Sequence, residues 1–149
     1  MVYIMKMLME LILFADDFPV ETVAQKIGLP VIEIAEKGNI RLTGPDKTIS
    51  RIEETSSITF ATEWVETIDL NVVIEKMYNL LAPKENIIRK CIDLYRLHAK
   101  FCAVVHLSEN PILQMSKEFV SLAANLHAEI EFDTYLDYDD NDRPILHTE

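Results

Sequence analysis

The sequence predicts an α+β fold in which a mixed, largely antiparallel sheet of about six strands carries helices packed on one face. Every second residue of the segments 3–15 and 97–107 belongs to a fully apolar face while the other face is mixed, and apolar and acidic residues largely alternate over 129–138, which is typical of strands with one buried face. Apolar stripes with helical spacing lie between these segments. The predicted order is strand, helix, three strands, two helices, strand, helix, strand.

The first half of the chain begins with the alternating strand over residues 3–15. A helix follows between Pro19 and Gly28, because proline suits a first helical turn and glycine suits a helix end. A short strand over 31–34 comes next, and turn signals at 37–39 and 44–46 precede two further strands near 47–53 and 56–66. In the last of these strands, alternation places three large residues on one face, which suggests an antiparallel pair: Ile58, Phe60 and Trp64.

The second half begins with a helix that Asp69 can cap, and Pro83 separates it from a second helix ending near Tyr95. Residues 97–107 form the clearest strand of the chain. Ser116 can cap the last helix, which leads into the final strand over 129–138. The first two strands flank one helix and the last two flank another, so both units are predicted to be βαβ elements.

The chain has 149 residues, which fits a single domain over 1–149, with an ordered core over about 3–138 and a polar tail over 139–149. Cys91 and Cys102 fall in apolar patterns, and two buried thiols indicate a reducing compartment. Glu10 interrupts the apolar N-terminal run, which stays well below the roughly 18 residues of a membrane span. The sequence therefore predicts a cytoplasmic protein without a targeting or membrane segment.

The net charge of −11 restricts the partners of the protein. Nucleic acid is excluded as a partner because the chain has no basic excess to neutralise phosphates. An anionic membrane surface is disfavoured for the same reason. A basic protein partner fits this charge, and so does a plain role in solubility.

Four carboxylates are predicted to share one face of the final strand: Glu129, Glu131, Asp133 and Asp137. Like charges along a strand repel one another, by about a few tenths of a kcal/mol each, so a role in binding would explain the row. The other interpretation is a solvated sheet face, or a sheet edge that charge protects from aggregation. The sequence offers these four residues as the candidate partner-binding site.

No catalytic, cofactor-binding or metal-binding residue is predicted. His98, Cys102 and His106 lie four residues apart on one strand face, a spacing of roughly 13 Å that one metal ion cannot bridge. The sequence contains neither the G-x-S-x-G motif of nucleophilic hydrolases nor a glycine-rich phosphate loop. These observations favour a role other than catalysis.

Several motifs in a fixed order carry a family resemblance. They are Leu13-Phe14-Ala15-Asp16-Asp17-Phe18-Pro19, Ile27-Gly28-Leu29-Pro30, Glu36-Lys37-Gly38-Asn39, Trp64, Leu80-Leu81-Ala82-Pro83-Lys84, and the strand–helix–strand from Ala99 to Tyr138. Over about residues 8–138 the chain resembles the bacterial domain-of-unknown-function family numbered 4279. The resemblance implies a small stand-alone bacterial protein and carries over no catalytic residue.

Three functions are consistent with the sequence. The first is a protein–protein interaction module whose acidic face binds a basic partner, for example an immunity protein that neutralises a cationic toxin. The second is a small-molecule binding or sensing domain with a pocket between sheet and helices near Trp64 and Tyr95. The third is a hydrolase that uses two carboxylates, which would need raised pKa values in one cleft.

Overall fold

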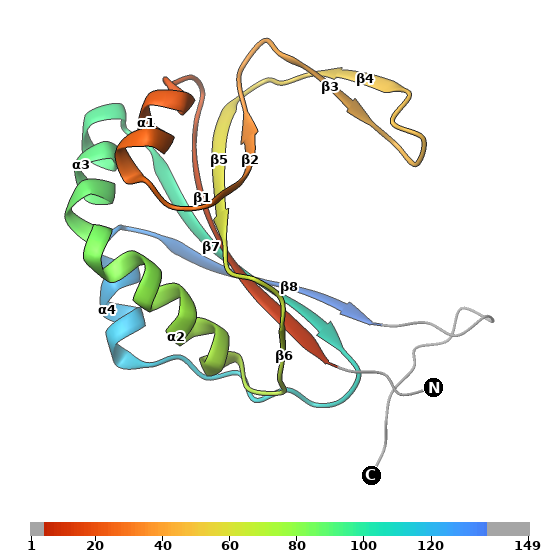
Figure 1. Ribbon diagram of the computed structural model, residues 1–149, viewed down its shortest axis with the longest axis vertical. Coiled ribbons are helices and arrows are strands. Elements are labelled where there is room, and N and C mark those ends of the chain that lie inside the picture. Colours follow the sequence, from red (N-terminus) through yellow and green to blue (C-terminus); the bar gives the residue numbers. More distant parts are fainter. Residues whose placement is uncertain (1–4, 137–149) are drawn as a thin grey trace.

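The computed structural model describes residues 5–136 and confirms the predicted α+β fold. A six-stranded sheet has the strand order β2-β5-β1-β7-β8, and β6 (Val65–Glu66) also pairs with β1. The sheet is mixed and mostly antiparallel. The helices lie together on one side of it (Figure 1).

The centre of the sheet is β1 (Lys6–Ala15), which pairs antiparallel with β5 (Ser56–Ala61) and β7 (His98–Leu107). In this register Leu11 lies between Phe60 and Phe101. The two edges are β2 (Val31–Ala35), antiparallel to β5, and β8 (Glu129–Leu136), parallel to β7.

The two predicted βαβ units differ in the structure. The unit β7, α4 (Lys117–Asn125) and β8 has two adjacent parallel strands, as expected. In the first unit, α1 (Val20–Ile27) connects β1 to β2, but β5 lies between these two strands. The strand β2 pairs with β5 rather than with β1, through a register that shifts between Val31 and Glu33.

The prediction for residues 40–66 is partly wrong. A separate two-stranded sheet forms from β3 (Ile40–Thr43), which was not predicted, and β4 (Ile49–Ile52). The strand predicted over 56–66 is interrupted: β5 ends at Ala61, and pairing with β1 resumes in β6. At the interruption the N–H of Met9 donates to the side-chain Oγ1 of Thr62 (3.1 Å). Trp64 is consequently 44% exposed, whereas Ile58 and Phe60 lie in the core.

The helical layer follows the predicted caps. Asp69 caps α2 (Leu70–Leu81) by accepting from the N–H of Asn71 at 2.9 Å, and Ser116 caps α4 through the N–H of Phe119 at 3.3 Å. A 3₁₀ turn (Ala82–Lys84) containing Pro83 joins α2 to α3 (Glu85–Tyr95). Gly28 ends α1 with a φ of 69°, a conformation that glycine adopts without strain.

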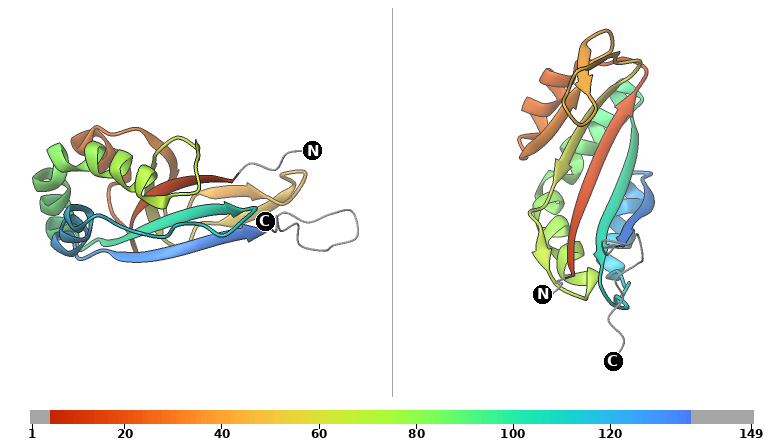
Figure 2. Two further views of the ribbon diagram at one scale, coloured as in Figure 1. Left: turned by 90° about the horizontal axis from the view of Figure 1, so that it is seen from below. Right: turned by 90° about the vertical axis from the view of Figure 1, so that its right-hand side faces the viewer.

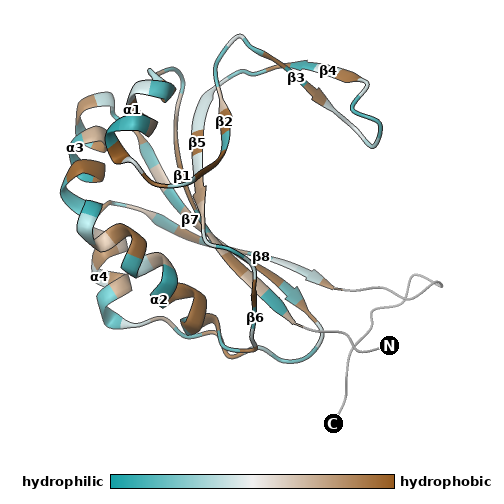
Figure 3. Cartoon of the chain, viewed as in Figure 1, coloured by the Kyte–Doolittle hydropathy of each residue, from teal (hydrophilic) through white to brown (hydrophobic). Residues whose placement is uncertain are grey.

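The core lies between the helices and one face of the sheet. Alternate residues of β1 and β7 are buried against the helices, and Figure 3 shows that hydrophobic residues occur along both strands. Phe101 of β7 meets Phe119 of α4 with ring centroids 4.8 Å apart. Cys91 and Cys102 are buried free thiols. No helix within residues 5–136 is long and apolar enough to cross a membrane.

The contact between the two phenylalanine rings makes Phe101 a test of the core. We expect Phe101→Ala to lower the free energy of unfolding by about 3–5 kcal/mol, since it removes a fully buried ring and leaves a cavity. Leu94→Ala is the control, because Leu94 is 67% exposed and its loss should change stability by less than about 0.5 kcal/mol. Urea denaturation of both variants measures the difference. Equal effects would contradict the assignment of the core.

Candidate functional site: the open sheet face

The sheet has a second face, opposite the helices, that no helix of the described chain covers (Figure 2, right). We call it the open face. Strand pairing aligns its side chains in rows that run across β1, β7 and β8. The open face consists of Lys6, Leu8, Glu10, Ile12 and Phe14 of β1, of His98, Lys100, Cys102, Val104 and His106 of β7, and of Glu129, Glu131, Asp133 and Tyr135 of β8.

Three of the four predicted partner-binding carboxylates lie on this face. Glu129, Glu131 and Asp133 occupy alternate positions of β8, with the first two exposed and the third partly buried. Asp137 lies outside the described residues. Alternate residues of a strand are about 6.6–7 Å apart, so the three carboxylates form an evenly spaced row along the edge of the sheet.

Glu10 of β1 and Lys100 of β7 lie beside this acidic row, closer to the centre of the sheet. Strand pairing aligns Glu10 with Cys102 and Cys102 with Glu131. Lys100 forms an ion pair with Glu131 at 2.9 Å, and the hydrogen bond raises the pKa of the Lys100 ammonium. Burial, followed by the charge of Asp133, raises the pKa of Glu10.

Cys102 lies within this acidic surrounding and is not suited to act as a nucleophile. Burial, followed by the neighbouring carboxylates of Glu10 and Glu131, raises its pKa to about 11. A thiol needs a lowered pKa to supply a reactive thiolate at neutral pH. Cys102 therefore acts as a buried apolar residue in the middle of the row.

Three neighbouring aromatic side chains lie at one end of the open face, and we call them the aromatic group: Trp64, His106 and Tyr135. The ring of His106 meets Trp64 edge-on at 5.1 Å between centroids and Tyr135 at 5.2 Å. The Nζ of Lys6 lies 4.7 Å from the centre of the Trp64 ring, and the Tyr135 hydroxyl donates to Asp133 at 2.8 Å. Trp64 and Tyr135 remain 44% and 48% exposed, so both rings are available for contact.

The residues of the rejected metal site are spread along β7. His98 stacks on Phe14 at the opposite end of the open face, with ring centroids 5.2 Å apart. His106 belongs to the aromatic group just described, and Cys102 lies midway between the two histidines. Among residues 5–136, no three histidine, cysteine or acidic side chains are grouped as metal ligands.

Sequence reasoning found the acidic row but not its neighbours. Glu10, Lys100 and His106 were visible as polar positions in predicted strands. Neither the pairing of β1 with β7 nor the register between β7 and β8 was predicted, so the sequence did not place these residues beside Glu131. Trp64 was assigned to the wrong face, because the alternation was extended past Thr62. The signal that could have helped is the polar alternate face shared by the strands over 3–15, 97–107 and 129–138.

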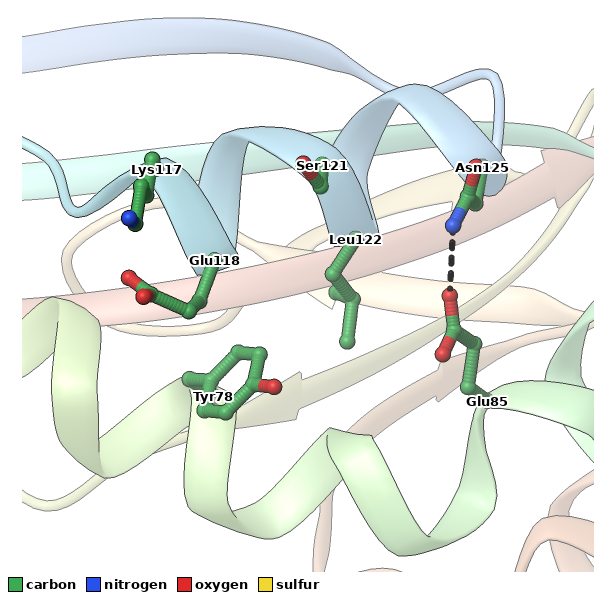
Figure 4. A pocket seen from close by; sticks show the side chains of 7 residues that line it. All are labelled: Tyr78, Glu85, Lys117, Glu118, Ser121, Leu122 and Asn125. Carbon is green, nitrogen blue, oxygen red and sulfur yellow. Dashed lines mark hydrogen bonds between the residues drawn. The ribbon is translucent and has the colours of Figure 1, made fainter.

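Trp64 and Tyr95, near which the sequence predicted a ligand pocket, lie far apart in the structure. Trp64 contacts His106 near the end of β7, whereas Tyr95 precedes the start of β7 and lies beside Lys26, whose Nζ is 5.8 Å from its ring centre. The ends of this strand are roughly 25–30 Å apart. A hollow of about 380 Å³ lies instead between α2 and α4. Its lining includes Tyr78 and the hydrogen bond from Asn125 to Glu85 at 3.1 Å (Figure 4).

The raised pKa of Glu10 predicts a specific pH dependence of stability. The folded protein holds this proton to a higher pH than the unfolded chain does, so the free energy of unfolding should fall as pH rises from about 4.5 through the folded pKa. Glu10→Gln should remove this part of the decrease, so its stability relative to the natural chain should grow between pH 4 and pH 7.

Urea denaturation across this pH range measures the effect on Glu10. Glu54→Gln, in an exposed loop between β4 and β5, serves as the matched control. A Glu10→Gln curve parallel to that of the natural chain would contradict the assigned environment of the carboxyl group.

Comparison with known proteins identifies the family of the chain. The family model described as a domain of unknown function (DUF4279) matches residues 5–137. No curated protein and no solved structure shows significant similarity to the chain. The matched segment covers most of the 149 residues, including β1, β7, β8 and the open face they form. The chain therefore belongs to the DUF4279 family of domains of unknown function.

Proposed function

We propose that the protein is a protein-interaction module that binds a basic partner through the open face. The observation that carries this proposal is the evenly spaced acidic row of β8 on a sheet face that no helix within residues 5–136 covers. A sheet face of this kind offers a broad surface, which suits a protein partner better than a small ligand.

The charges of the open face favour a cationic partner. Its carboxylates are Glu10, Glu129, Glu131 and Asp133, and its two ammonium groups already have contacts. Lys100 pairs with Glu131, and Lys6 lies over the Trp64 ring. The chain as a whole carries a net charge of −11, so long-range attraction would also speed the encounter with a basic protein.

The aromatic group supplies the second component of a protein-binding surface. Trp64 and Tyr135 are partly exposed at the end of the acidic row. Tryptophan and tyrosine are enriched among the residues that contribute most to binding energy. Lys6 shows that a lysine ammonium can lie over the Trp64 ring, so a lysine or arginine of the partner could contact the ring in the same way.

Affinity capture from an extract of the source cell tests the proposal. The variant Glu129→Gln/Glu131→Gln/Asp133→Asn removes the acidic row and should weaken partner capture about tenfold or more. The captured protein should be basic, and raised salt should release it, because exposed charges are screened. Mass spectrometry identifies the protein, and biosensor titration measures its affinity.

The control variant is Glu21→Gln/Glu54→Gln/Glu75→Gln, which removes the same number of carboxylates, all of them outside the open face. It should capture the partner as the natural chain does. An equal loss of partner capture in both variants would show that net charge, and not the acidic row, determines binding. Salt-insensitive capture, or the absence of any basic partner, would contradict the proposed function.

A further inference from the structure

Two helix-to-strand connections of the same form lie side by side at one end of the sheet. The helix α3 leads through Arg96 and Leu97 into β7, and α4 leads through Leu126, His127 and Ala128 into β8. Because β7 and β8 are parallel neighbours, aligned from Lys100 and Glu129 onward, both strands begin at the same end. In each connection the last two residues are a polar one followed by an apolar one, and a polar residue of the open face begins the strand.

Arg96 and His127 both adopt the left-handed backbone conformation, each with a φ of 52°. Each closes its helix in the usual way, since the N–H of Leu97 donates to the carbonyl of Ile92 at 3.0 Å and that of Ala128 donates to the carbonyl of Ala123 at 2.9 Å. Glycine commonly occupies this position because a side chain strains it. The chain thus keeps two long polar side chains where glycine would cost less in strain.

The two strained residues line the same hollow. This hollow has a volume of about 390 Å³, near the lower end of the roughly 300–1,000 Å³ found for small-molecule sites. His98 and Glu129, which begin the two strands, also line it, and the ring of Phe14, stacked on His98, forms part of its wall. Side chains from both connections therefore converge on one small space.

The hollow presents one cation and one anion that are available to a ligand. Asp93 lines it too, but both its carboxylate oxygens accept from Arg89 at 3.1 Å. Neither Arg96 nor Glu129 forms an ion pair within residues 5–136. Opposite charges that line one hollow without pairing there can both be satisfied by a ligand that carries an ammonium group and a carboxylate.

We propose that this hollow binds a small zwitterion of the α-amino acid type. The planar guanidinium of Arg96 receives the ligand carboxylate, and Glu129 receives the ammonium group. Phe14 and His98 provide the aromatic wall against which the ligand side chain packs. A zwitterion has no net charge, so the net charge of the protein does not repel it.

Titration of the full chain with a panel of free L-amino acids, followed by NMR, tests the proposal. At least one amino acid should produce saturable shifts of the backbone amides of 96–98 and 127–129. Its amide, which lacks the carboxylate, and its deaminated acid, which lacks the ammonium group, should each bind about tenfold more weakly or worse. Arg96→Gly should abolish the preference for the acid over the amide, and Glu129→Gln should abolish the preference for the amine.

Lys47 provides the matched control for backbone strain. It also has a positive φ, of 51°, but it lies in the turn between β3 and β4, far along the chain from the hollow. Arg96→Gly and Lys47→Gly should both leave the Tm unchanged or raise it by about 2–4 °C, because glycine relieves the strained conformation. Only the first substitution should alter ligand binding.

Three results would overturn the inference. One is the absence of saturable shifts with every amino acid of the panel. Another is that Arg96→Gly still binds the amino acid more tightly than its amide and that Glu129→Gln still binds the amino acid more tightly than its deaminated acid. The third is a marked loss of Tm in Arg96→Gly but not in Lys47→Gly, which would show that Arg96 is retained for folding.

Discussion

The packing of one face of β1 against the helices is the constraint on which the rest of the structure depends. Met7, Met9, Leu11 and Leu13 are fully buried. A shift of one residue in the pairing of β1 would turn these side chains to solvent, so burial fixes the register with both β5 and β7. The same register determines which residues share the open face. The acidic row and its aromatic neighbours therefore hold their relative positions because of contacts made on the opposite side of the sheet.

The fold could largely be predicted from the sequence where a pattern was long. The alternation in β1, β7 and β8, the caps Asp69 and Ser116, and the break at Pro83 gave the main elements. The failures came from short or interrupted patterns. The strand β3 has four residues, too few for periodicity to show, and no local pattern predicts the interruption between β5 and β6, where the Thr62 side chain accepts a hydrogen bond. Strand order was also beyond reach, because β2 pairs with β5 rather than with β1.

The candidate site shows the same division between local and long-range information. The row Glu129, Glu131 and Asp133 lies on one strand, so period two sufficed to find it. Its contacts with Glu10 and Lys100 join segments about 30 to 120 residues apart, which alternation alone cannot pair. The hollow near Arg96 and His127 depends on a left-handed φ at both positions, which is uncommon for residues other than glycine and which the sequence did not predict. Local patterns thus identify which residues share one face of a single strand, whereas the residues beside that face are known only once the strand pairing is known.

The central position of β1 has a consequence for how the chain folds. This strand is synthesised before its partner β7, which lies about a hundred residues further along the chain, so that Lys6 pairs with His106. Contacts between segments so distant in sequence close large loops, and proteins rich in such contacts fold slowly. One edge of β1 therefore has no partner until β7 has been made, although β5 can pair with its other edge earlier. The chain is expected to fold more slowly than helical proteins of similar length, so chaperones would have time to bind β1 before β7 has been made.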